Sequence, residues 1–188
     1  MLIKKCVVLF SGNGSNLENL LNKRDIVKDK LNYISAFTDN AKANGIEVCK
    51  KFNLDVSVGR KDTLYKDLHK FLSDNDPDLI ILSGYMKIIP ELIVNMYLGK
   101  IINIHPSLLP KYPGLNTYEK VIKNRDKDHG ATIHFVTKDL DEGPIILQGS
   151  FSVRKGMAKV ELEKFTHKTE YIIFPIVVEW FAEDIIKF

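Results

Sequence analysis

Short apolar runs alternate with helix-like segments along the first hundred residues, and this alternation constrains the fold more than any other feature of the sequence. The apolar runs, each typical of a buried strand, lie at 6–10, 33–38, 78–84 and 100–106. The segments with helical spacing of apolar residues lie at 16–23, 41–53, 64–73 and 91–97. Strands that alternate with helices are typical of right-handed βαβ units on a parallel sheet.

The second half of the chain has a different pattern. A loop with two prolines and one glycine covers 107–116, and two alternating runs at 130–137 and 144–153 predict antiparallel strands. Helical spacing extends over 157–181, where we expect Pro175 to interrupt the helix. The pattern predicts an α/β fold: a doubly wound, mostly parallel, Rossmann-like sheet with an antiparallel C-terminal extension. A length of 188 residues suits a single domain, 1–188.

Composition narrows the class of protein. Lys and Arg exceed Asp and Glu by 27 − 24 = 3, and the excess is scattered, which argues against nucleic acid as a partner. No stretch reaches the roughly 20 apolar residues of a membrane span, and the apolar run near the N-terminus is too short for a signal peptide. We therefore expect a cytoplasmic protein with no membrane partner, in which Cys6 and Cys49 are inert thiols.

A glycine-rich loop, Ser-Gly-Asn-Gly-Ser-Asn, follows the first predicted strand and precedes a helix. Backbone N–H groups at such a position bind anions, phosphate above all. Gly12, Gly14 and Asp39 fit part of a dinucleotide fingerprint, but Leu17 stands where its third glycine belongs. The other interpretations are a single phosphate held by residues 14–16 and a purely structural turn.

Two polar residues mark the end of a predicted strand. Asn103 and His105 are two positions apart, so they share one face of that strand. An amide and an imidazole suit the negative oxygen that develops when a carbonyl is attacked. Asp141 lies in a turn, where a carboxylate alone is a solvated turn former, but within reach of His105 it would favour imidazolium or move a proton through water. The spacing leaves open whether they meet.

Three further polar residues carry weaker signals. We interpret His129 and His134 as structural, because they lack the spacing and the carboxylate neighbours of a metal site, and we expect no metal. Glu170, on the late helix, is by itself a surface acid.

The ordered motifs of the chain resemble the folate-dependent formyltransferase family, and within it the phosphoribosylglycinamide formyltransferase branch. They are VVLFSGNGSNL, LSGYMKIIP, INIHPSLLPKYPGL, HGATIHFVT, LDEGPIILQ and YIIFPIVVEWF, and they cover nearly the whole chain. The resemblance implies transfer of the formyl group of 10-formyltetrahydrofolate to glycinamide ribonucleotide, in purine biosynthesis. It implies small-molecule partners only and leaves the oligomeric state open.

The resemblance also implies roles for individual residues. Asn103, His105 and Asp141 match the catalytic trio of the family. The residues matched to ribonucleotide binding are Gly12, Asn13, Gly14, Ser15, Asn16 and Glu170. The residues matched to folate binding are Arg60, Met86, Lys87, Ile88, Ile89, Asn103, Thr137, Lys138, Asp139, Leu140 and Asp141. Lys87 stands where an Arg is common, and Lys61 is an alternative to Arg60.

The implied mechanism assigns Asn103 and His105 to the oxyanion and Asp141 to proton movement. We expect the loop at 110–116 to close over the site, with Gly114 as its hinge. Two alternatives remain at this stage. One is another folate-dependent formyltransferase or a formyltetrahydrofolate deformylase. The other is a nucleotide-binding, dehydrogenase-like module that uses the glycine-rich loop.

Overall fold

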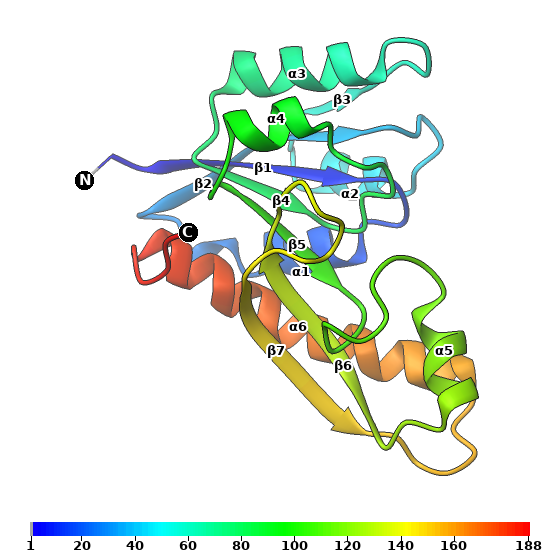
Figure 1. Cartoon of the computed structure of the whole chain (residues 1–188). Helices are drawn as coiled ribbons and strands as arrows, with labels where there is room; N and C mark the ends of the chain where they lie inside the picture. The colour runs from blue at the N-terminus through cyan, green and yellow to red at the C-terminus, as the bar shows by residue number, and fades with distance from the viewer. Residues whose placement is uncertain (1) are drawn as a thin grey trace.

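The structure, a computed structural model, describes residues 2–188 as one seven-stranded sheet with helices on both faces (Figure 1). The strands are β1 (Lys4–Phe10), β2 (Leu31–Thr38), β3 (Val56–Val58), β4 (Leu79–Leu82), β5 (Ile101–His105), β6 (Asp128–Phe135) and β7 (Ile145–Ser152). The helices are α1 (Ser15–Asn22), α2 (Gly45–Lys51), α3 (Leu64–Asn75), α4 (Glu91–Met96), α5 (Thr117–Asn124) and α6 (Lys159–Ala182), with a 3₁₀ turn at Arg24–Ile26.

The strand order is β3-β2-β1-β4-β5-β6-β7. The first five strands pair in parallel, whereas β6 is antiparallel to both β5 and β7. The predicted fold class, a mostly parallel sheet with an antiparallel C-terminal extension, is confirmed. Because β1 and β5 both end at the same edge of the sheet, the two predicted site segments that follow them begin from that edge.

Alternating residues of the strands supply the two layers of the core. On β1, Cys6, Val8 and Phe10 pack with α1, α2 and α6, whereas Val7 and Leu9 pack with α3 and α4 on the opposite face. Figure 1 shows α3 and α4 above the sheet and α1 and α6 below it. This is the arrangement that the near-continuous apolar runs of the parallel strands require.

The polar residues of β5 lie on the face opposite α6. Ile102 and Ile104 point into the core layer that contains α6, so Asn103 and His105 point to the other side. Contacts from the loops at 107–116 and 136–144 cover that side of β5. The site is therefore built on a rigid strand and covered by loops.

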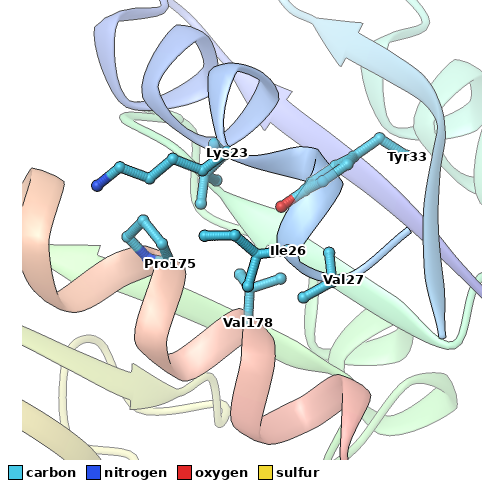
Figure 2. Close-up of a pocket in the computed structure, with 7 residues that line it drawn as sticks. Lys23, Ile26, Val27, Tyr33, Pro175 and Val178 are labelled. Atoms are coloured by element: carbon cyan, nitrogen blue, oxygen red, sulfur yellow. The ribbon is translucent and has the colours of Figure 1, made fainter. Parts of the chain in front are cut away.

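The predicted interruption at Pro175 is wrong, because α6 continues through it from Lys159 to Ala182. Proline removes the N–H that would bond the carbonyl one turn earlier, at Tyr171. That carbonyl instead accepts the Asn19 amide at 3.1 Å and the Lys23 ammonium at 2.9 Å. Figure 2 shows Lys23 beside Pro175, at a small hollow between the 3₁₀ turn and α6. Side chains distant in sequence thus satisfy the carbonyl and keep the helix intact.

Two elements had no clear signal in the sequence. Strand β3 has three residues at the edge of the sheet, and α5 buries only Thr117 and Val121.

Cys6 and Cys49 are buried free thiols, and burial raises the pKa of both. Within residues 2–188, no helix is sufficiently long and apolar to cross a bilayer.

Candidate active site

Asn103, His105 and Asp141 meet in the structure. The Asn103 amide nitrogen lies 3.4 Å from Asp141 Oδ1, and His105 Nδ1 lies 3.2 Å from Asp141 Oδ2. The loop at 136–144 brings Asp141 back over the strand that carries the other two. Sequence spacing left this meeting open, and the structure supplies it.

The electrostatics of this trio depend on burial and on the contacts around Asp141. Burial raises the pKa of Asp141, but its contacts with His134, the Gly114 N–H and His105 outweigh burial, and the net pKa is lowered. Burial lowers the pKa of His105, and Asp141 and the Tyr112 carbonyl offset only part of that effect. At neutral pH the site therefore combines a carboxylate with a predominantly neutral imidazole.

His134 also belongs to this cluster, which corrects its interpretation as a purely structural residue. It pairs with Asn103 across β5 and β6, and its Nε2 lies 3.1 Å from the Asn103 amide nitrogen and 3.6 Å from Asp141 Oδ1. Its Nδ1 lies 2.9 Å from the Phe135 carbonyl oxygen. Antiparallel pairing of β5 with β6 could have pointed to His134, because the residue opposite Asn103 on β6 lies on the same face of the sheet.

The loop that follows β5 is attached to the same cluster. The Gly114 N–H donates to Asp141 Oδ2 at 2.8 Å, and His105 Nε2 lies 2.8 Å from the Tyr112 carbonyl oxygen. The Tyr112 hydroxyl in turn donates to Asp126 at 2.7 Å. Both ring nitrogens of His105 therefore face acceptors, and the loop contacts the trio. Closure of the loop over the site, with Gly114 as its hinge, stays a prediction.

His129 lies among aromatic side chains, and its interpretation as structural stays a prediction. Its ring packs edge-on against Tyr118 and Phe151, with centroids 5.7 and 5.8 Å away, and its Nε2 has no hydrogen-bond partner within residues 2–188. Burial is the main cause that lowers the pKa of His129 to about 4. Burial in this aromatic setting thus keeps the imidazole neutral.

Acidification is expected to destabilise the protein through His129. Between pH about 6.5 and about 4 the unfolded chain binds a proton that folded His129 does not, so the free energy of unfolding falls as pH falls through this window. His129→Phe keeps an aromatic ring and removes the titration. Urea unfolding at pH 7 and pH 5 should show a smaller loss of stability in the variant than in the parent; an equal loss would contradict the assignment.

The glycine-rich loop connects β1 to α1. Gly14 has φ +73°, and a Cβ there would lie 2.7 Å from the Gly45 Cα, so both the conformation and the space require glycine. Helical hydrogen bonding begins when the Glu18 N–H donates to the Gly14 carbonyl at 2.8 Å. The N–H groups of residues 15–17 therefore have no partner within the helix, and N–H groups in this position can donate to an anion.

Glu170 lies beside this loop and is not a surface acid. It is only 4% exposed, and its Oε2 accepts the Asn16 amide at 2.8 Å. His167 Nδ1 lies 2.9 Å from the same oxygen. The structure thus brings together two residues, Asn16 and Glu170, that the sequence pointed to separately.

A cleft of about 870 Å³ lies next to the glycine-rich loop and includes Lys61 and Lys87. Its full lining is Ser11, Asp39, Asn40, Lys61, Asp62, Thr63, Leu64, Tyr65, Lys66 and Lys87. Arg60 is absent from this lining, because its guanidinium pairs with Asp67 at 2.8 Å. The Lys87 ammonium lies 3.9 Å from Asp39, which also accepts the Ser11 hydroxyl.

The two segments predicted to bind folate are largely accessible. Met86, Ile88 and Leu140 are exposed large apolar side chains, whereas Ile89 is buried. The Met86 N–H donates to the Ser11 hydroxyl at 2.8 Å, which fixes the start of residues 86–89 against the glycine-rich loop. Within residues 2–188 the structure shows no group of three or more His, Cys, Asp or Glu side chains arranged to hold a metal ion.

Known proteins resemble the chain over nearly its whole length. The sequence profile of the Formyl transferase family matches residues 4–178. The chain is 35% identical to the phosphoribosylglycinamide formyltransferase of Escherichia coli, over 96% of this chain and 88% of that protein. It is 36% identical to the Haemophilus influenzae enzyme of the same name, over the same shares of the two proteins.

Solved structures give the same result. The crystal structure of phosphoribosylglycinamide formyltransferase from Anaplasma phagocytophilum has a TM-score of 0.92 and 34% identity, with 97% of this chain and 89% of that one covered.

Proposed function

The chain belongs to the formyl transferase family, and we propose that it transfers the formyl group of 10-formyltetrahydrofolate to the amine of glycinamide ribonucleotide. The products are formylglycinamide ribonucleotide and tetrahydrofolate, in de novo purine biosynthesis. One observation carries the proposal: Asn103, His105 and Asp141 form a contact cluster in a chain that matches enzymes named for this reaction over nearly its whole length.

The trio would stabilise the attack of the amine on the formyl carbon. When the new C–N bond forms, the formyl oxygen becomes an oxyanion, and the Asn103 amide and the His105 ring would donate hydrogen bonds to it. His105 would turn from the Tyr112 carbonyl, which it faces at 2.8 Å, to that oxygen. These hydrogen bonds strengthen as the negative charge develops on the oxygen, so they lower the barrier.

Asp141 would assist the transfer of the proton that the amine loses. Its lowered pKa keeps it ionised, and its position 3.2 Å from His105 Nδ1 lets it stabilise an imidazolium. The proton passes, through water, to the folate nitrogen as the bond from that nitrogen to the formyl carbon breaks. The amine thus loses one proton and the folate gains one.

The glycine-rich loop would hold the phosphate of the ribonucleotide. The N–H groups that follow Gly14 and the positive end of the α1 dipole favour a dianion there. Gly12 and Asn13 form the first half of the loop, and Glu170 lies close enough to contact Asn16. This arrangement would leave the amine of the substrate free to reach the trio.

The folate would lie along the residues at 86–89 and 137–141. Contacts through the backbone of these segments do not depend on side-chain identity, so Lys87 in place of Arg leaves them unaffected. For the tail of the folate, Lys61 is better placed than Arg60, because Lys61 lines the cleft while the Arg60 guanidinium is engaged by Asp67. The cleft walls also carry Lys66, a further cation for an acidic tail.

An absorbance assay with a 10-formyl folate tests the proposal. We expect folate release that depends on added glycinamide ribonucleotide and saturates with it. Release at the same rate without the ribonucleotide would show a deformylase instead. If the folded protein gives no release in either condition, the proposed activity is wrong.

A further inference from the structure

The carboxylate of Glu170 is held by two residues on different helices. Asn16 donates to it from the first turn of α1, and His167 contacts it from one turn earlier on α6. Both contacts use Oε2 of Glu170, so neither of them occupies Oε1. A carboxylate that is almost completely buried is costly unless its charge is compensated, and these two contacts supply that compensation.

Asn16 presents a second acceptor at the same place. Its Nδ2 is committed to Glu170, and its Oδ1 is buried with no hydrogen-bond partner in the part of the chain that the structure describes. Asn16 is also more than nine-tenths buried. A buried acceptor without a partner is rare in folded proteins, and a hydrogen bond donated by a ligand would satisfy this one.

His167 is the accessible member of this group. Its side chain is about half exposed, whereas that of Glu170 is 5% exposed, and the ring stacks on Tyr171 with centroids 6.2 Å apart. The hydrogen bond to Glu170 is the largest cause of the raised pKa of His167, with a further contribution from Glu163 on the same helix. The contact with Glu170 thus favours the protonated ring, and in that form the ring makes a charge-assisted hydrogen bond to Glu170.

We propose that His167 is a positioning residue for the ribonucleotide substrate. Its Nδ1–H holds Glu170 against Asn16, so that Glu170 Oε1 and Asn16 Oδ1 form a pair of acceptors for N–H or O–H groups of the substrate, next to the phosphate position. His167 acts through Glu170 and has no part in the chemical step. This inference rests on the proposed function, because it assigns the substrate of that same site.

The test uses steady-state kinetics on the full chain with three variants. His167→Ala should raise KM for glycinamide ribonucleotide by about tenfold, because a charge-assisted hydrogen bond behind the site is lost. The kcat and the KM for the formyl folate should stay near the parent values. In His167→Asn, the amide nitrogen takes nearly the position of the imidazole Nδ1, and this variant should restore most of the ribonucleotide KM.

His69→Ala is the matched control, since His69 lies on α3, on the opposite face of the sheet, and should keep all parent values. An unchanged ribonucleotide KM in His167→Ala overturns the inference, as does a joint loss of kcat and both KM values with no rescue by His167→Asn. Failure of the proposed function is distinct, because the parent itself would then show no ribonucleotide-dependent release.

Discussion

Replacing Asp141 with asparagine is expected to lower kcat by about a thousandfold while the protein stays folded. The carboxylate lies 3.2 Å from His105 Nδ1, and its lowered pKa keeps it charged at neutral pH. Asparagine retains an oxygen that accepts the Gly114 N–H, so the loop contact survives. The change therefore removes the charge that would stabilise an imidazolium. It keeps the loop contact, and the Asn103 amide loses the Oδ1 acceptor.

Ribonucleotide-dependent folate release at saturating substrates measures this effect, and the thermal unfolding midpoint checks the fold. Glu142→Gln is the matched control, because it neutralises the adjacent exposed carboxylate and should keep parent turnover. Turnover within a few-fold of the parent in Asp141→Asn would remove Asp141 from the mechanism.

Asn103→Leu should lower kcat by about a hundred- to a thousandfold, the usual cost of losing one donor to an oxyanion. The Asn103 amide nitrogen lies 3.4 Å from Asp141 Oδ1 and 3.1 Å from His134 Nε2, so these two groups hold it in place in the free protein. Leucine has a similar size and cannot donate. The loss should appear in kcat, because the oxyanion exists only in the transition state and the intermediate.

Kinetics of Asn103→Leu beside Asn32→Leu would test this. Asn32 is an exposed residue near the start of β2, so its substitution should leave kcat unchanged. A rise in folate KM with kcat preserved in Asn103→Leu would show that Asn103 binds the co-substrate but does not stabilise the oxyanion.

The sheet and the polar strand end were predictable because they depend on local patterns. The apolar runs of β1 and β4 are continuous because both of their faces are buried, and β5 begins in the same way. Asn103 and His105 interrupt such a run at its end, which is a local signal for a site. Residues whose role follows from a strand position could thus be found without the structure.

The remaining features depend on contacts between distant parts of the chain. Asp141 is 38 residues from Asn103, and only the return of the loop at 136–144 over β5 brings them together. The continuity of α6 through Pro175 requires Asn19 and Lys23, which are far from it in sequence. His134 has the spacing of an ordinary strand residue, and its membership of the site follows from its pairing with Asn103.

The place of Glu170 in the site also depends on contacts between distant parts of the chain. As a helical acid it carried no signal of its own beyond the family resemblance. Its burial comes from the packing of α6 against α1, which places it beside Asn16. The partnership with His167 is local, three residues apart on one helix, but its importance is visible only once Glu170 is known to be buried.

Transfer of a labelled carbon tests the central claim most directly. The protein would be incubated with glycinamide ribonucleotide and a 10-formyl folate labelled with ¹³C in the formyl group, and the products would be examined by NMR. The account predicts that the label appears as a formamide carbon on the substrate nitrogen, at a rate that Asp141→Asn lowers by about a thousandfold and Glu142→Gln preserves. Label found only as free formate would contradict it.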